Sequence, residues 1–180
     1  MKKTISILFC SMLLFGCSDN TEKIDNSKIT KMLNTSNLEK ISSHTEKAIP
    51  IDYIAPTTKD AINALPYEVT LPSEFPISYN SFEVTLLQDV KHDKKRVRAE
   101  FQATSSDSLE TTTVFTSNQE STYMGTRFKE ININDDIKGN FNGQSLNFKF
   151  NDVYYNLTVE KSDSLPTEKE VIALAKQMID

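Results

Sequence analysis

A tight hairpin signal in the last third of the chain most restricts the fold. The dipeptide Asn142-Gly143 separates residues 137–141 from residues 146–150, and apolar and polar side chains alternate in both segments. Asn-Gly is the preferred pair for a two-residue turn because both positions need positive φ. A second pair, Asn151-Asp152, leads into a third alternating segment, 153–160. The sequence therefore predicts a three-stranded antiparallel meander here.

Earlier segments extend the predicted sheet. Apolar side chains recur at every second position of residues 97–103, as Val97, Ala99, Phe101 and Ala103. This is the pattern of a strand with one buried and one wet face. Further strands are predicted over residues 67–71, over 82–87 with Phe82, Val84 and Leu86 on one face and Leu87 on the other, and over 109–116. The less regular residues 123–133 leave room for one more.

Two helices are predicted from capping pairs. Thr167 and Glu170 fit a capping box ahead of apolar residues at helical spacing, which are Val171, Leu174, Ala175, Met178 and Ile179. Thr57 and Asp60 fit the start of a short helix that ends before Pro66, because a proline pushes the preceding residue out of the α region. The predicted class is α+β: an antiparallel β-sheet meander covered by one C-terminal α-helix.

The N-terminus has the pattern of a bacterial lipoprotein signal peptide. Lys2 and Lys3 precede an apolar stretch, residues 5–15, and Gly16 stands just before Cys17. This stretch is too short for a membrane span, which needs about 20 residues. Residues 1–16 are therefore predicted as a leader, and Cys17 as the lipidation site, with palmitate among the expected acyl chains. Two acyl chains would hold the protein stably on the extracytoplasmic face of the cell membrane.

Composition divides the rest of the chain. Residues 17–49 are predicted as a flexible, lipid-anchored polar tether, because Asn, Ser, Thr, Lys and Glu predominate there and apolar residues are isolated. Met32 and Leu33, with Ile29, leave open a marginal helix within this tether. Residues 50–180 are predicted as one α+β globular domain with a single modest core.

The charge balance excludes some partners. Loss of Lys2 and Lys3 with the leader lowers the 20 basic residues to 18 against 25 acidic ones, a formal charge of about −7. This sign argues against nucleic acid and against adhesion to an anionic membrane by net charge. One local exception is the basic turn (residues 91–96), with Lys91, His92, Lys94, Lys95 and Arg96. An exposed turn is favoured there over contact with teichoic acid or lipid headgroups.

Residue types that carry chemistry are scarce. The two histidines are His44, in the tether, and His92. Cys10 leaves with the leader and Cys17 is lipidated, so no free thiol is expected and neither a zinc site nor a Cys-His pair is predicted. Asp135 and Asp136 lack the spacing of a calcium loop. We therefore predict no catalytic, cofactor-binding or metal-binding residue, no cofactor, and a protein that is not an enzyme.

Several short motifs together resemble a known family. They are Ala64-Leu65-Pro66-Tyr67-Glu68-Val69-Thr70-Leu71-Pro72, Phe75-Pro76, Tyr79, Ile137-x-Gly139, Leu146-x-Phe148, Tyr154-Tyr155-Asn156-Leu157 and the closing helix 170–179. In this order they resemble the DUF4367-type domain, which is related in fold to the LolA and MucB group. The resemblance covers residues 61–180 and implies a helix-covered antiparallel sheet and a Gram-positive home. It carries no functional residue across, and Ser78 and Phe148 stand where the family commonly has glycine and tryptophan.

These features lead to one preferred function and two alternatives. We expect a membrane-anchored, non-enzymatic binding module for a protein or an amphiphile at the cell envelope, which uses a sheet edge or the space between sheet and helix. That space is either packed solid or hollow, and a hollow one would suit a lipid. The first alternative is a regulatory partner in envelope signalling, and the remote one is a hydrolase with an unrecognised site.

The anchor is testable in cells. Cys17→Ala should release the protein from the membrane fraction, because the position that receives the lipid then has no thiol. Cys10→Ala, inside the leader, should leave membrane association unchanged. Fractionation followed by immunoblotting measures both variants, and a Cys17→Ala protein that stays with the membrane would contradict the prediction.

Overall fold

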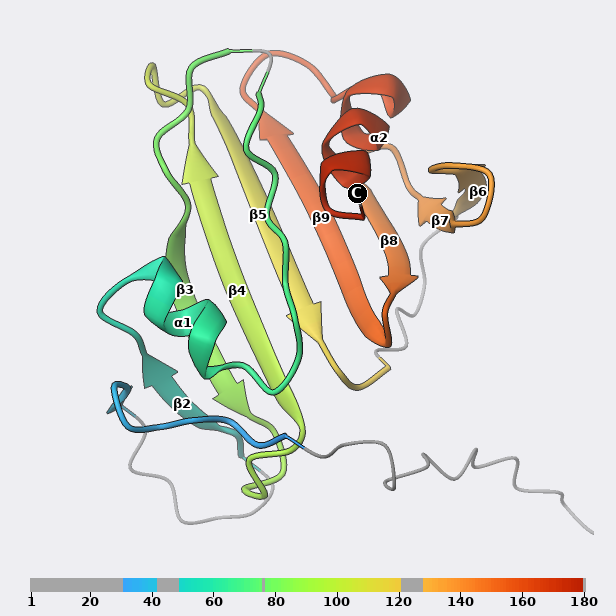
Figure 1. Ribbon diagram of the computed structural model, residues 1–180. Coiled ribbons are helices and arrows are strands. Elements are labelled where there is room, and N and C mark those ends of the chain that lie inside the picture. The colour runs from blue at the N-terminus through green and yellow to red at the C-terminus, as the bar shows by residue number, and fades with distance from the viewer. Residues whose placement is uncertain (1–30, 42–48, 76, 121–127, 180) are drawn as a thin grey trace, which may run out of the picture.

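The protein is described here by a computed structural model, over residues 31–41, 49–75, 77–120 and 128–179. In these residues one antiparallel sheet has the order β1-β2-β3-β4-β5-β9-β8-β7-β6 (Figure 1). The strands are β1 (Glu39–Lys40), β2 (Ile51–Ile54), β3 (Glu83–Asp89), β4 (Val97–Thr104), β5 (Glu110–Ser117), β6 (Lys129–Asn132), β7 (Lys138–Phe141), β8 (Ser145–Phe150) and β9 (Val153–Lys161). The helices are α1 (Thr58–Ala64) and α2 (Glu168–Gln177). The expected α+β class is confirmed.

The sheet combines two meanders. Strands β1 to β5 follow one another across one half, and β6 to β9 run back across the other half toward the centre. Strand β9 then pairs with β5 in an unbroken register from Glu110↔Lys161 to Ser117↔Tyr154. This long pairing makes the two halves one continuous surface.

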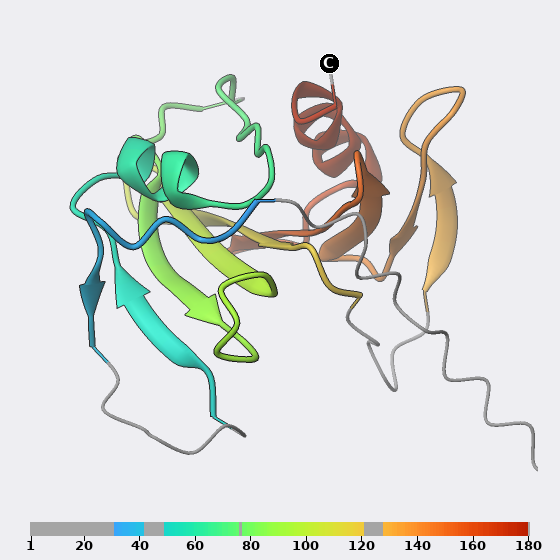
Figure 2. The same ribbon diagram turned by 60° about the horizontal axis from the view of Figure 1, so that its bottom comes forward.

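Both helices lie on the same face of the sheet (Figure 2). Between them runs an extended segment, described over residues 65–75 and 77–82, which we call the strap; its first part, residues 65–75, crosses this face in front of the central strands (Figure 1). The fully buried side chains of the central strands include Leu87, Val97, Phe101, Val114, Leu146 and Leu157. They form one core with Val171 and Ala175 of α2 and Ala61 of α1. The core therefore lies between the sheet and the layer of helices and strap.

The predicted hairpins and helix caps are confirmed, but the first turn lies one residue later than expected. The Asn142 amide donates to the Ser145 carbonyl oxygen, and Gly143 but not Asn142 has positive φ (99°), so the two turn residues are Gly143 and Gln144. The Asn142 side chain accepts hydrogen bonds from the amides of Gln144 and Ser145. Asn151 and Asp152 also have positive φ, as a tight turn between β8 and β9 requires. Thr57 caps α1, and a capping box of Thr167 and Glu170 starts α2. The signals needed for these elements lie within a few residues of one another, which is why the sequence reveals them.

The strand predicted over residues 67–71 is wrong. Tyr67, Val69 and Leu71 do pack against the core, but they belong to the strap and pair with no strand. The Tyr67 hydroxyl lies 3.1 Å from the buried Thr116 hydroxyl and donates to the Val97 carbonyl oxygen at 3.3 Å. The alternation thus reflects a segment lying flat on a sheet, where every second side chain also points inward.

The face predicted for Leu86 is also wrong. A register shift between Val84 and Leu86 places an extra residue in β3, so Leu87, not Leu86, joins Val84 on the inner face. Leu87 is fully buried, whereas Leu86 is half-buried on the opposite face. One inserted residue exchanges the two faces of a strand, because its side chains alternate.

The packed body begins before residue 50, within the segment predicted as a flexible tether. The exposed fraction of Leu33 is 3%, and its side chain belongs to the core. The amide of Leu33 donates to the Lys94 carbonyl oxygen at 2.7 Å, and the amide of Asn34 donates to the Ala64 carbonyl oxygen at 2.9 Å. Strand β1 also pairs with β2. The buried Leu33, the two backbone hydrogen bonds and the β1–β2 pairing together hold this polar segment, which composition alone does not indicate.

This packing gives a stability prediction. Leu33→Ala should lower the free energy of unfolding of the mature chain by about 2–4 kcal/mol, as for other buried leucines. Met32→Ala is the matched control, since Met32 is 52% exposed, and it should change stability by less than about 0.5 kcal/mol. Urea denaturation followed by far-ultraviolet circular dichroism measures both. Equal effects of the two substitutions would show that the segment is not packed.

Candidate binding groove

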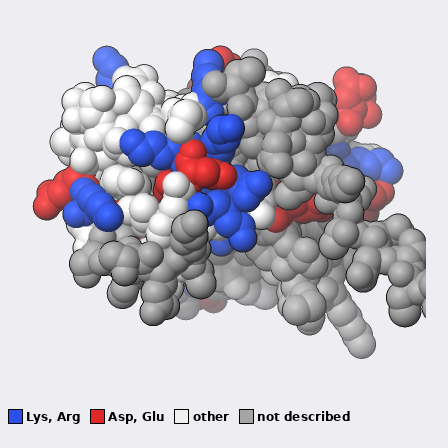
Figure 3. Space-filling view, turned by 90° about the horizontal axis from the view of Figure 1, so that it is seen from below, with Lys and Arg blue, Asp and Glu red and all other residues white. Residues whose placement is uncertain are grey.

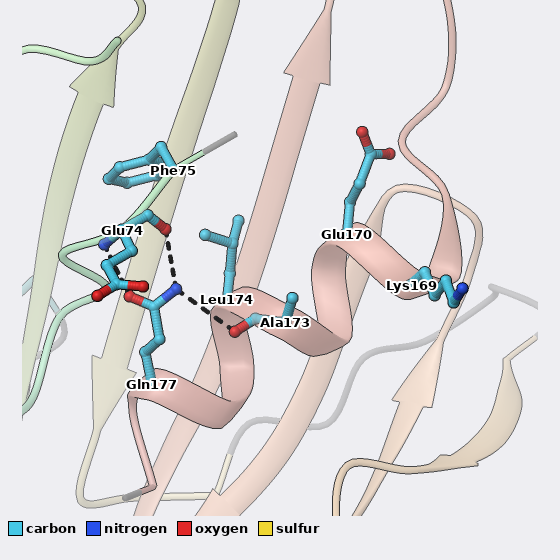
Figure 4. Close-up of a pocket in the computed structure, with 7 residues that line it drawn as sticks. All are labelled: Glu74, Phe75, Lys169, Glu170, Ala173, Leu174 and Gln177. Atoms are coloured by element: carbon cyan, nitrogen blue, oxygen red, sulfur yellow. Dashed lines mark hydrogen bonds between the residues drawn. The ribbon is translucent and has the colours of Figure 1, made fainter. Parts of the chain in front are cut away.

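A groove lies between the strap and α2 (Figure 4). Its volume is about 530 Å³, and its lining residues are Glu74, Phe75, Lys169, Glu170, Ala173, Leu174 and Gln177. Phe75, Ala173 and Leu174 give it an apolar floor. Charged side chains stand at its ends, with Glu74 on the strap and Lys169 and Glu170 on the first turns of α2.

Gln177 fixes the width of this groove at one end. Its side-chain oxygen accepts hydrogen bonds from the amides of Ser73 and Glu74, at 2.9 and 2.8 Å. Its side-chain nitrogen donates to the Glu74 carbonyl oxygen at 2.8 Å (Figure 4). One amide group therefore satisfies three backbone groups of the strap and ties that wall to the end of α2.

Aromatic contacts hold the strap wall. The Phe75 ring stacks on the Tyr79 ring, with ring centroids 4.1 Å apart and ring planes at 16° to each other. The centroid of the Phe82 ring lies 5.9 Å from that of Phe75. The Tyr79 hydroxyl donates to the Glu110 carboxylate at 3.1 Å, which links the strap to β5. Burial is the main cause that raises the pKa of Tyr79, so this hydroxyl stays protonated at neutral pH. The position of the strap wall is thus fixed by its bond to strand β5 beneath it.

An ion-pair cluster fixes the helix wall. Lys161 of β9 lies 2.7 Å from the Glu170 carboxylate and 3.4 Å from that of Glu110. The bond from Lys161, followed by those from the backbone and hydroxyl of Thr167, lowers the pKa of Glu170 to about 2. The same pairing raises the pKa of Lys161. The Glu170 carboxylate is therefore engaged by the start of α2 and by the sheet. Among the charged lining residues, this leaves Glu74 and Lys169 available to a ligand.

The space directly under α2 is packed. Val171 and Ala175 are fully buried, and Leu174 and Met178 are 4% and 1% exposed. Of the two alternatives for the space between sheet and helix, these side chains favour the solid one. The concavity lies instead on the strap side of α2. Phe75 and Gln177 could not be recognised as lining residues from the sequence, since the contact between residues 74 and 177 spans about a hundred residues and no local pattern signals it.

A second concavity, of about 510 Å³, lies between the start of α1 and the end of the strap. Its lining includes Thr57, Thr58, Lys59, Ser81 and Glu83. The Thr58 hydroxyl donates to the Phe82 carbonyl oxygen and closes one side. This lining is predominantly polar, so the groove beside α2 is the better candidate for an apolar ligand.

The structure also locates the residues singled out in the sequence. Cys17, Cys10 and His44 lie outside the described residues. His92 has its Nε2 atom 2.6 Å from the Ile49 carbonyl oxygen. Asp135 and Asp136 are exposed in the turn between β6 and β7, where the Asn134 side chain accepts the amides of Asp136 and Ile137.

The described residues offer neither a metal-binding cluster nor a membrane-spanning helix. In that part of the chain no three or more His, Cys, Asp or Glu side chains gather as a metal site would require. None of the helices found there has the length and apolar character of a membrane span.

Comparison with known proteins adds no relative. No protein-family model matches the chain, and no curated protein or solved structure is significantly similar to it. The groove therefore has to be interpreted from its own chemistry.

The ion pair under the groove predicts a pH dependence. Because the pKa of Glu170 is about 2 in the folded chain against an ordinary 4.5, its stabilisation is present above pH 4.5 and is lost as pH falls toward 2. Glu170→Gln should lower stability at pH 7 by about 1–2 kcal/mol, after allowance for its partial exposure. The same substitution should flatten the loss of stability between pH 4.5 and 2.

The matched control is Glu168→Gln on the same helical turn. Glu168 pairs with Lys129 through side chains that are 39% and 69% exposed, so its removal should change stability by less than about 1 kcal/mol. Urea midpoints measured from pH 7 to pH 2 compare the three proteins. A Glu170→Gln variant with the acid sensitivity of the unsubstituted chain would contradict the assignment.

Proposed function

We propose that this chain is a non-enzymatic binding module, held by a lipid on Cys17 at the outer face of the cell membrane, whose groove beside α2 takes an amphiphile. The observation that carries the proposal is the groove itself, with an apolar floor and Glu74 and Lys169 at opposite ends. Pockets with apolar walls and a few polar groups at defined positions are typical of small-molecule sites.

The rigidity of both walls supports a binding role. The strap is tied to α2 through Gln177 and to β5 through Tyr79. The helix is tied to β9 through Glu170 and Lys161. A site with walls fixed before binding loses little conformational freedom when the ligand enters, and this favours affinity.

The chemistry of the lining supports a role without catalysis. Its ionisable side chains are Glu74, Lys169 and Glu170, and Glu170 is paired with Lys161 below the groove. The groove lining includes no histidine, cysteine or serine that would form a nucleophile and base pair. Binding, with the apolar part of an amphiphile over Phe75 and Leu174 and its polar group at the rim, is the function that we infer.

Filling the groove tests this proposal. Ala173 is exposed on α2 and lines the groove, so Ala173→Trp should occupy it and weaken binding of a fluorescent lysophosphatidylglycerol at least tenfold. Lys176→Trp places the same side chain on the same helix away from the lining and should retain affinity. Fluorescence titration of the Cys17→Ala mature chain, with probe below its critical micelle concentration, measures both. Absence of saturable binding, or equal binding by the two variants, would refute an amphiphile site.

A protein segment of the same amphiphilic character is the other occupant that the groove admits. A photo-crosslinking amino acid at position 173, compared with one at position 176, distinguishes it in intact cells. A discrete crosslinked protein formed only from position 173, together with failure of the lipid titration, would assign the groove to a protein partner.

A further inference from the structure

The basic turn, residues 91–96, joins β3 to β4 at the end of the molecule where the N-terminal segment joins the body. Figure 3 views this end directly, and Lys and Arg side chains gather near its centre. Lys91 and Lys95 are exposed, as is Lys31 at the start of the described chain. Lysine and arginine side chains thus surround an acidic group at this place (Figure 3), whereas acidic residues predominate in the protein as a whole.

Contacts of the N-terminal segment fix it to this turn. The Leu33 amide donates to the Lys94 carbonyl oxygen at 2.7 Å, and the Lys94 ammonium donates to the Thr35 hydroxyl at 3.0 Å. The buried side chain of Leu33 holds the same segment in the core. Whatever precedes residue 31 therefore reaches the domain beside the basic turn.

The carboxylates within the turn are used by its backbone. Asp89 is buried and accepts the amides of Asp93 and Lys94, at 3.2 and 3.0 Å. Asp93 accepts the amides of Lys95 and Arg96, at 2.9 and 3.1 Å. These bonds draw both negative groups toward the peptide chain, while Lys91 and Lys95 extend into solvent. Asp93 also lies 3.9 Å from the Arg96 guanidinium and is 34% exposed, so the charges that the turn extends into solvent are mainly those of Lys91 and Lys95.

We propose that the basic turn docks on an anionic lipid headgroup surface and sets the orientation of the domain on its membrane. This inference rests on the proposed function for the lipid at Cys17. Sixteen residues lead from Cys17 to Leu33, a length that spans at most ~58 Å in any conformation. Strand β9 alone has nine residues, roughly 30 Å of sheet. If the opposite end of the domain faced the membrane, about half of this reach would be needed to pass along the domain. Contact through the basic turn needs none of it, because the chain from Cys17 joins the domain there.

Net charge does not oppose this contact. Charges interact strongly only within about 8 Å at physiological ionic strength, so the acidic groups elsewhere on the molecule are screened from a surface that touches the turn. Each exposed lysine near an anionic leaflet strengthens the contact by roughly fivefold. The tether keeps the turn near the surface, so even two or three lysines are sufficient to orient the domain.

Lysine footprinting tests the orientation. The mature chain, residues 17–180, is coupled through the Cys17 thiol to maleimide-lipid in vesicles, which makes the test independent of lipidation in the cell. Acetylation rates are read by mass spectrometry on vesicles with 30% phosphatidylglycerol and on pure phosphatidylcholine. Lys91 and Lys95 should react at least threefold more slowly on the anionic vesicles at low salt, and the difference should vanish at high salt. Lys138 and Lys176, both exposed and distant in sequence from the turn, should react equally on both vesicles.

A charge variant with a matched control completes the test. Lys91→Gln with Lys95→Gln should abolish the protection of Lys31 on anionic vesicles, whereas Lys138→Gln with Lys176→Gln should preserve it. Unchanged rates at Lys91 and Lys95 would overturn the inference, as would protection by soluble teichoic acid without protection by the vesicles. Absence of a lipid on Cys17 in the native protein would instead refute the proposed anchor, and mass measurement of the protein isolated from cells detects that case separately.

Discussion

The pairing of β5 with β9 is the interaction on which the rest of the structure depends. These strands are far apart in the chain, and their ladder from Glu110↔Lys161 to Ser117↔Tyr154 joins two meanders that would otherwise be separate small sheets. The ladder places Val114 opposite Leu157, both fully buried, at the centre of the core. It also brings Glu110 and Lys161 together under the groove. Without it neither the strap nor α2 would have a common surface to cover.

The strap converts that surface into a site. Extended segments that lie on a sheet need partners for their polar groups, and here Tyr67 and Tyr79 find them at Thr116 and Thr112 of β5. Burial raises the pKa of both tyrosines, and the Tyr79 hydroxyl accepts from Thr112 while it donates to Glu110. The strap is held to β5 and α2 is held to β9, so the sheet sets the width of the groove between the strap and α2. The proposed binding role depends on this geometry rather than on a reactive residue.

The proposed ligand site and the proposed membrane contact use different surfaces of the domain. The groove beside α2 would receive a ligand, while the basic turn beside Leu33 and Lys94 would face the membrane. A tether that enters next to the basic turn gives the domain a preferred orientation, and orientation decides what the groove can reach. Local charge matters more than the overall negative balance here, because screening limits each charge to its near surroundings.

The sequence by itself determined the elements whose signals are local. The hairpin signal at Asn142-Gly143, the Thr167 and Glu170 capping box and the alternation through Phe101 each depend on residues close together in the chain, so α+β class, hairpins and helix positions follow from them. The lipidation of Cys17 is likewise a prediction from local pattern, and it lies outside the described residues. Only the tertiary structure decided that residues 67–71 form a strap, that a bulge exchanges Leu86 for Leu87, and that Leu33 belongs to the core. It alone placed Gln177 against Glu74. The physical reason is that each of these outcomes depends on which distant surface a segment contacts. A pattern of alternating or polar residues in the sequence is the same whether that neighbour is a strand, a sheet face or water.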